Sequence, residues 1–228
     1  MIQLPAIDER SIPDSLKLLC NIYPGQLIFT TSFGMEDQVI TDIICKNNLP
    51  VKFMTLDTGR LFEETYKVFS RTIEKYNIQI ETCHPDPEDL SNLLKKKGPF
   101  SFYESVENRK ECCNIRKVIP LRKALAGNNV WITGLRSEQS ESRAEIKTIS
   151  YDEGYGIIKY NPLHNWTLEE VKSYIKENNI PYNVLHDRGF PSIGCAPCTR
   201  TVAEGEDIRS GRWWWENNTK KECGLHTR

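Results

Sequence analysis

Residues 27–37 read LIFTTSFGMED, a short apolar and β-branched run that stops at Ser32-Phe33-Gly34. Leu27–Thr31 has the composition of a strand, and Glu36–Asn48 carries apolar residues at helical spacing. This stretch therefore predicts a strand, a tight turn and a helix. Ser32 and Gly34 in such a turn can present backbone N–H groups to an anion, although the G-x-x-x-x-G-K-[ST] pattern of a P-loop is missing.

The same unit recurs along the chain. Val51–Leu56 ends in Asp57-Thr58-Gly59 and precedes a helical pattern over Arg60–Tyr76. Further strands are expected at Ile78–Thr82 and Asn129–Thr133, a hairpin at Ile146–Ile149 and Ile157–Tyr160, and helices at Asp86–Lys97, Arg109–Ala126 (bent or split by Pro120) and Thr167–Asn178. Strands that alternate with helices predict an α/β fold: a mostly parallel sheet with helices on both faces and a ligand crevice at the strands' carboxyl ends.

The domain organisation follows from length and pattern. A chain of 228 residues is expected to form a single domain over residues 1–228. Its α/β core spans about 15–190. The periodic pattern is lost from about residue 191, so that about 191–228 is expected to be an irregular C-terminal functional segment, with a C-x-x-C and a mobile tail.

Composition excludes several classes of protein. The formal net charge of −1 gives no general field for a nucleic-acid backbone, and no apolar run approaches the roughly 18–20 residues that span a bilayer. The start, MIQLPAIDERSIP, does not read as a signal peptide. We therefore expect a cytoplasmic protein without nucleic-acid or membrane partners. In a reducing compartment, its eight cysteines favour ligands, redox groups or buried small residues over disulfides.

Four cysteines stand in two close groups, Cys112-Cys113 and the C-x-x-C of Cys195 and Cys198. Four thiolates gathered in space suit a soft metal site, either zinc or an iron–sulfur cluster. Adjacent cysteines on one helix point about 100° apart, which is awkward for tetrahedral zinc, so a [4Fe-4S] cluster is favoured. The alternative is that the first pair consists of ordinary helix residues and the second is a redox pair.

Cys223 stands apart, in the sequence ECGLH near the end of the chain. Its neighbours Lys220, Lys221 and His226 are cationic or can become so, and they favour the nucleophilic thiolate. Cys20, Cys45 and Cys83 fall in helix or strand patterns and are expected to be buried as small apolar residues.

Cationic residues gather beside these features. Lys117 lies one helical turn after Cys113, and others follow the fourth strand (Arg136, Arg143) or the C-x-x-C (Arg209, Arg212). Guanidinium groups suit phosphate and sulfate oxygens, so an anionic substrate is expected here. Arg136 can instead serve the fold of its turn.

Taken together, these segments resemble the assimilatory adenylyl-sulfate (APS) reductases of the family that also contains the 3'-phosphoadenylyl-sulfate (PAPS) reductases. The matching segments are TTSFGMEDQV, LDTGRLFEETY, CCNIRKVIPL, TGLRSEQSESR, KYNPLHNWT, GCAPCTR, GEDIRSGRWWWE and KKECGLH. The resemblance implies an adenine nucleotide alpha hydrolase-like fold. It also implies that members with Cys-Cys and C-x-x-C bind a [4Fe-4S] cluster and prefer APS. Typical PAPS reductases keep only the ECGLH cysteine.

The resemblance further implies a mechanism for sulfate assimilation and cysteine biosynthesis. Adenosine would contact Ser32, Gly34, Leu56 and Gly134, and the phosphosulfate would contact Lys117, Arg143, Arg209 and Arg212. The Cys223 thiolate would attack the sulfur of APS, release AMP and keep an S-sulfonate. Thioredoxin or glutaredoxin, a separate protein, would then release sulfite. The cluster ligands would be Cys112, Cys113, Cys195 and Cys198.

Two alternatives to this function stay open. The first is a PAPS or dual APS/PAPS reductase of the same family. The second is an ATP-pyrophosphatase-type enzyme on the same fold, which would carry an S-G-G-x-D-S loop where this chain has Ser32-Phe33-Gly34-Met35-Glu36-Asp37. Phe33 leaves little room there for a pyrophosphate. We also expect a homo-oligomer.

Overall fold

The computed structural model describes residues 4–140, 143–216 and 224–226. The chain forms two compact units. The first comprises residues 1–55, 63–81 and 127–184, and the second comprises residues 56–62, 82–126 and 185–228. The segment expected to be functional, from about residue 191, belongs to the second unit.

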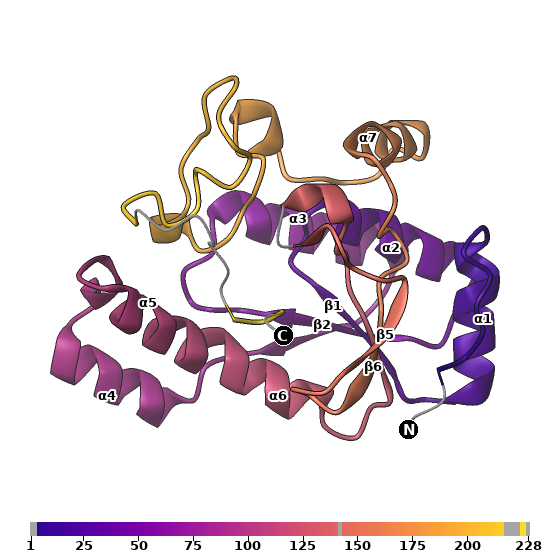
Figure 1. Ribbon diagram of the computed structural model, residues 1–228, viewed down its shortest axis with the longest axis horizontal. Helices are drawn as coiled ribbons and strands as arrows, with labels where there is room; N and C mark the ends of the chain where they lie inside the picture. Colours follow the sequence, from indigo (N-terminus) through magenta and orange to yellow (C-terminus); the bar gives the residue numbers. More distant parts are fainter. Residues whose placement is uncertain (1–3, 141–142, 217–223, 227–228) are drawn as a thin grey trace. The chain divides into compact units, whose positions relative to one another are not determined.

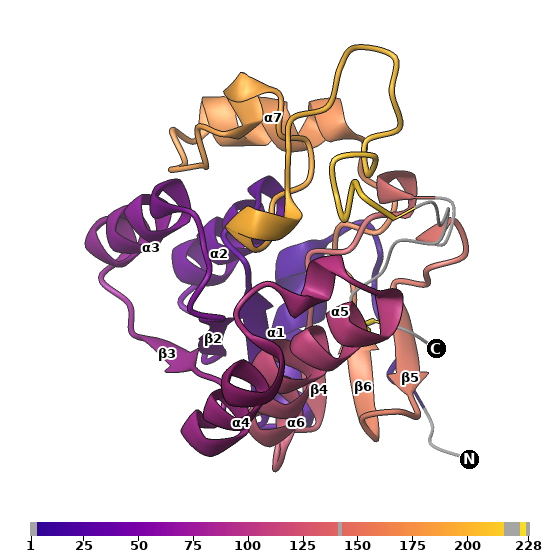
Figure 2. The ribbon, with the colours of Figure 1, turned by 90° about the vertical axis from the view of Figure 1, so that its left-hand side faces the viewer.

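In the described part of the chain, one six-stranded sheet has the order β3-β2-β1-β4-β6-β5 (Figures 1 and 2). Its strands are β1 (Leu27–Thr31), β2 (Lys52–Leu56), β3 (Ile80–Cys83), β4 (Val130–Ile132), β5 (Ile149–Asp152) and β6 (Ile157–Tyr160). β1 pairs in parallel with β2 and β4, β4 pairs in parallel with β6, and β5 is antiparallel to β6. The expected mostly parallel sheet is therefore confirmed, and so is its terminal hairpin, although the first strand of the hairpin is Ile149–Asp152 and not Ile146–Ile149.

Four helices belong to the described part of the first unit: α1 (Ile12–Ile22), α2 (Met35–Lys46), α3 (Glu63–Tyr76) and α7 (Leu168–Glu177). The capping box expected at α7 is present, since Thr167 accepts from the Glu170 backbone and Glu170 accepts from that of Thr167. α1 was not expected. Its signal is local: Ser11 accepts a hydrogen bond from the backbone of Asp14, and Pro13 occupies the first turn.

The core of the first unit explains the strand pattern. Leu27 and Phe29 of β1 are 1% and 0% exposed, and they join Val39 and Ile40 of α2 in one apolar cluster. A parallel strand covered by helices reads as a nearly continuous apolar run, as β1 does. The third strand begins two residues later than expected, at Ile80, because Asn77 adopts φ 49° after α3 and turns the chain first.

The second unit contains the helix that carries the tandem cysteines. α5 (Val106–Cys113) and α6 (Ile119–Leu125) are joined by a π-helical turn over Asn114–Val118, and in Figure 1 they follow one another along a single rod. The expected split is therefore confirmed, although it lies just before Pro120. Proline has no N–H to donate to the preceding turn. The N–H of Ile119, just before it, bonds to the carbonyl of Asn114, five residues earlier, which is the hydrogen bond of a π-helix. α4 (Pro87–Lys97) packs against this π-helical turn.

The C-terminal segment of the second unit is mostly irregular, as expected. Thr199 and Arg212 form an isolated antiparallel bridge, and a short 3-10 turn covers Ala196–Cys198. Within the described ranges, no helix is both long and apolar enough to cross a membrane.

Candidate active site

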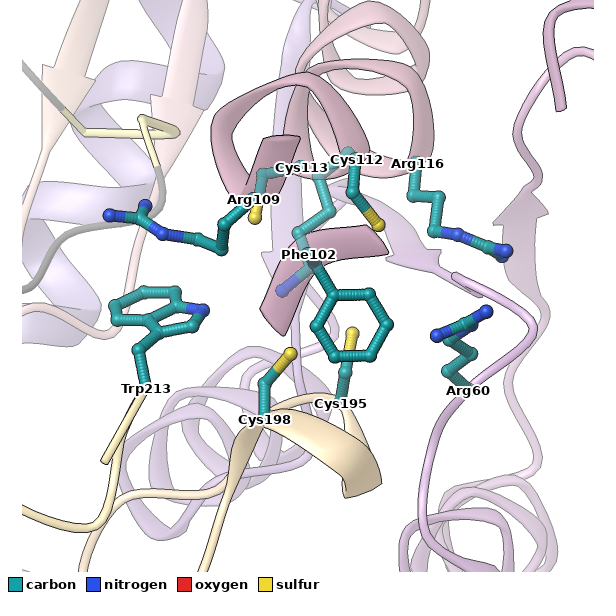
Figure 3. A pocket seen from close by; sticks show the side chains of 10 residues that line it. Arg60, Phe102, Arg109, Cys112, Cys113, Arg116, Cys195, Cys198 and Trp213 are labelled. Carbon is teal, nitrogen blue, oxygen red and sulfur yellow. The ribbon is translucent and has the colours of Figure 1, made fainter. Parts of the chain in front are cut away.

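Four cysteines from distant parts of the sequence line one pocket of the second unit. Cys112 and Cys113 end α5, and Cys195 and Cys198 frame the 3-10 turn of the C-x-x-C. Figure 3 shows the two pairs of thiols facing the same space from opposite sides. Cys113, Cys195 and Cys198 are buried, at 7%, 6% and 9% exposed. The fold thus brings together the four cysteines that the sequence singled out.

Backbone bonds hold the C-x-x-C loop in this position. The Ala196 N–H donates to the Arg60 carbonyl at 2.8 Å, and the Cys198 N–H donates to the Cys195 carbonyl at 2.9 Å. The Thr199 hydroxyl donates to the same Cys195 carbonyl at 2.9 Å. These bonds form within the second unit and hold the backbone that carries both thiols.

The described lining of the pocket is cationic. It contains four basic side chains and no carboxylate: Arg60, Arg109, Arg116 and Lys117. Arg116 donates to the Thr58 carbonyl at 2.6 Å, and Arg60 lies over the ring of Phe102 with its Cζ 5.0 Å from the centroid. Arg60 Nη1 and Arg116 Nε are buried and have no hydrogen-bond partner among the described residues. Two such donors in a positive pocket point to an anionic occupant.

The thiols respond to burial and charge in different ways. Burial acts to raise the pKa of Cys195, but the Lys117 ammonium, a hydrogen bond from Thr58 and the charge of Arg212 outweigh it, so that the pKa is lowered. Burial and the neighbouring Cys195 raise the pKa of Cys198 to about 12. Burial also raises the pKa of Cys112. Among the described residues, no group of three or more His, Cys, Asp or Glu side chains is placed to hold a metal ion.

The first unit carries a separate part of the predicted site, at the turn after β1. The Asp37 carboxylate accepts hydrogen bonds from the Ser32 N–H at 2.6 Å and from the Ser32 hydroxyl at 2.8 Å. Burial raises the pKa of Asp37 to about 6, although the bonds from Ser32 act in the opposite direction. Phe33 sits in the left-handed region at φ 60° and stacks on Phe69 with ring centroids 4.8 Å apart.

Gly134, at the end of the neighbouring strand β4, approaches the same carboxylate. A Cβ placed on Gly134 would lie 2.2 Å from Asp37 Oδ1 and 3.2 Å from Glu36 Cβ. Only glycine allows this approach, and it brings three of the predicted adenosine contacts, Ser32, Gly34 and Gly134, around Asp37.

The other predicted contacts are distributed over both units. Leu56 ends β2 and Lys117 lies in the π-helical turn of the second unit, where it is 9% exposed. Arg209 is half-buried in that unit, and Arg143 belongs to the first unit, where it bonds to the Gln139 side chain. Cys223 lies outside the described residues.

Arg212 is packed tightly within the second unit. It donates to the Ser192 hydroxyl at 3.2 Å, and its Cζ lies 4.8 Å from the centroid of the Trp213 ring. A Cβ on Gly194 would meet its guanidinium at 2.3 Å, so Gly194 leaves the space that Arg212 fills.

Arg136 belongs to the fold of its own turn. Its Nε donates to Glu36 at 2.8 Å, and its Nη1 donates to Glu138 at 3.2 Å and to the Trp166 carbonyl at 3.1 Å. At 4% exposed, it is buried among these partners. Cys20 is buried in the apolar core of the first unit and Cys45 packs against that core, which supports a structural role for both. Cys45 and Cys83 are only half-buried, so the expected burial is wrong for these two.

Sequence reasoning missed several residues of the site: Asp37, Arg60, Arg109, Arg116 and Glu216. Two of them carried a signal, because Arg109 and Arg116 lie three residues from Cys112 and Cys113, a spacing that keeps side chains on one face of a helix. Glu216 had no local signal, since its partner Arg109 is distant in the sequence.

Comparison with known proteins identifies the family of this chain. Residues 26–201 match the phosphoadenosine phosphosulfate reductase domain. The relatives include two proteins named adenosine 5'-phosphosulfate reductase. The one from Agrobacterium fabrum is 50% identical over 89% of this chain and 78% of its own length. The one from Neisseria meningitidis serogroup A is 52% identical over 87% of this chain and 82% of its own length.

Solved structures support the family in one case and the fold alone in another. A phosphoadenylyl-sulfate (PAPS) reductase from Candida auris in complex with phosphate has a TM-score of 0.70 and 34% identity, and the match covers 83% of this chain and 90% of that one. An FMN adenylyltransferase from Candida glabrata, with a TM-score of 0.54 and 16% identity over 90% of this chain and 69% of that one, shares the fold alone. The family model and the relatives cover most of this chain, and the chain therefore belongs to the phosphoadenosine phosphosulfate reductase family.

Proposed function

We propose that this protein reduces adenosine 5'-phosphosulfate to sulfite and AMP in sulfate assimilation, with Cys223 as nucleophile and thioredoxin or glutaredoxin as electron donor. The observation that carries the proposal is the gathering of Cys112, Cys113, Cys195 and Cys198 in one cationic pocket. The relatives that are about 50% identical are named for APS. The Candida auris relative, 34% identical, is named for PAPS, which keeps a PAPS or dual-specificity reductase as the alternative.

The pocket fits a [4Fe-4S] cluster better than a zinc ion. Tetrahedral zinc, with Zn–S bonds of about 2.3 Å, draws its sulfurs to within about 3.8 Å of one another. In a cubane each cysteine binds a different iron, so the sulfurs stay farther apart around a shared space. The four described cysteines face one shared space in two pairs from opposite sides (Figure 3). The donor set is also entirely sulfur, and the unpartnered donors of Arg60 and Arg116 suit an anionic group.

When bound, such a cluster would supply a fixed negative charge and would tie the two cysteine pairs together. The remaining chemistry belongs to the chain. Ser32 and Gly134 would receive the adenosine, and the cationic residues Lys117, Arg143, Arg209 and Arg212 would bind the phosphosulfate and stabilise the charge that develops on the leaving phosphate. Lys117, beside Cys195, would belong to both the thiol pocket and the anion site.

The proposed reaction balances in three steps. The Cys223 thiolate attacks the sulfur of APS, the S–O bond to the phosphate breaks, and AMP leaves with the electron pair. A thiolate of the dithiol carrier then attacks the Cys223 sulfur, and sulfite leaves. The second carrier thiol resolves the mixed disulfide, so the two electrons come from the carrier and Cys223 returns to the thiolate.

Metal analysis tests the cofactor. Protein purified without oxygen should contain about four iron and four sulfide per chain and be brown. Cys198→Ser should lose most of this iron, whereas Cys45→Ser, outside the pocket, should keep it. Colourless protein with one zinc per chain would refute the cluster.

Mass spectrometry tests the reaction. Incubation with APS and no reductant should add one sulfonate of about 80 Da, and peptide mapping should place it on Cys223. Cys223→Ser should bind APS and form no adduct or sulfite. Parallel reactions with PAPS, compared by kcat/KM, decide between APS and dual specificity. An adduct on Cys198 in protein with full iron would overturn the mechanism.

A further inference from the structure

A buried ion pair fastens the C-terminal segment to the helix that bears the tandem cysteines. Arg109 of α5 donates from Nε to Glu216 Oε1 at 2.8 Å and from Nη2 to Glu216 Oε2 at 3.0 Å. The two side chains are 2% and 4% exposed. Two parallel charge-assisted bonds between buried groups define both the distance and the orientation of the partners.

The residues just before Glu216 are held by the same arginine. Two guanidinium groups contact the Trp213 ring, with Arg109 Cζ 4.5 Å and Arg212 Cζ 4.8 Å from its centroid. Trp213 is 1% exposed and adopts φ 43°, which a bulky residue keeps only where its surroundings fix it. The backbone N–H of Trp213 donates to the Cys198 carbonyl at 3.2 Å, and the backbone N–H of Glu216 donates to the Trp213 carbonyl at 2.9 Å.

This anchor lies close in sequence to the proposed nucleophile. Cys223 follows Glu216 by seven residues, so its thiol can lie at most about 25 Å along the chain from the fixed point. Trp213 holds the same segment through its backbone bond to Cys198, ten residues before Cys223, so the ion pair fixes the chain three residues nearer to the nucleophile. A slower sulfur transfer at unchanged affinity for APS would therefore measure lost orientation.

We propose that Arg109 and Glu216 are positioning residues for sulfur transfer: their ion pair fixes the start of the segment that carries Cys223, so that the thiolate is presented in line with the substrate. The proposal rests on the proposed function of Cys223. It assigns to α5 a second task, because the helix that ends in Cys112 and Cys113 also holds the anchor. Neither residue is required to touch the substrate.

The test compares Glu216→Ala with the wild type in three measurements on iron-loaded protein. These are the single-turnover rate of adduct formation with APS, the Kd for APS by equilibrium dialysis, and amide hydrogen exchange of residues 212–216 without substrate. The rate should fall at least about fivefold, while the Kd stays within about twofold and exchange becomes faster. Glu169→Ala, which removes an exposed pair with Lys172 at 3.0 Å, is the matched control and should change none of the three.

Two further variants protect the test against simple unfolding. Arg109→Met/Glu216→Leu replaces the ion pair by apolar side chains of similar size that can pack together, and it should recover slow exchange of residues 212–216. If Glu216→Ala does not load iron, Glu216→Gln, which keeps one hydrogen bond, should show a threefold slower rate per iron-loaded chain.

An unchanged rate in the Glu216 variants would overturn the proposal, and so would a rate and an affinity that fall together. Failure of the proposed function itself has a different signature, because the wild type would then form no adduct, whereas the exchange measurement would still report the anchor.

Discussion

Asp37 offers a direct test of the turn after β1 through the pH dependence of stability. Its pKa is raised from 3.8 to about 6, first by burial and also by the neighbouring Glu36. A raised carboxyl pKa means that the folded protein holds the proton more tightly than the unfolded chain does. The stability from this proton is therefore complete below pH 4 and is lost as the pH rises through about 6.

The size of the effect follows from the shift. A change of about two pKa units corresponds to about 3 kcal/mol over the whole transition, of which about 1 kcal/mol falls between pH 5 and pH 7. Asp37→Asn has no proton to lose and should remove this contribution. The free energy of unfolding of the variant should therefore fall less steeply between pH 5 and pH 7 than that of the wild type.

Urea unfolding of both proteins at pH 5, 6 and 7, with matched iron content, measures this difference. Other titrating groups affect both proteins alike, so the difference between the two pH profiles isolates Asp37. Parallel profiles would show that the Asp37 carboxyl titrates as it does in water, and the reasoning from its burial and its bonds to Ser32 would then be wrong.

Two further predictions follow from the site. Gly134→Ala places a Cβ 2.2 Å from the neighbouring carboxylate. It should lower the free energy of unfolding by about 1–3 kcal/mol and weaken binding of AMP. In the control Gly154→Ala, the nearest atom is 3.4 Å away and stability should change little, so equal urea midpoints for the two variants would refute the close approach. The four proposed phosphosulfate contacts are Lys117, Arg143, Arg209 and Arg212. Alanine at any one of them should weaken APS binding or slow sulfur transfer at least about tenfold. Normal kinetics in all four variants would place the anion elsewhere.

Local pattern was sufficient for much of the fold. The strand at Leu27–Thr31 and the capping box at Thr167 were read from a few adjacent residues, because a parallel strand and a helix start each have a short-range signature. α1 was missed because its capping residues stand in a polar opening, although Leu16 and Leu19 are fully buried. The break in the long helix was expected at Pro120, but the π-helical turn over Asn114–Val118 precedes that residue. Proline has no N–H to donate to the preceding turn, so the helical hydrogen bonding changes there and not at Pro120 itself.

The sequence by itself determined the alternating α/β pattern, the two pairs of cysteines and the isolated Cys223, because these depend on residue type and spacing. Only the tertiary structure decided which side chains surround them. The cationic lining from Arg60 and Arg116, the approach of Gly134 to Asp37 and the pair between Arg109 and Glu216 join residues that are distant in the chain. Burial makes each of these contacts consequential, since charges that water would screen must find their partners inside the fold.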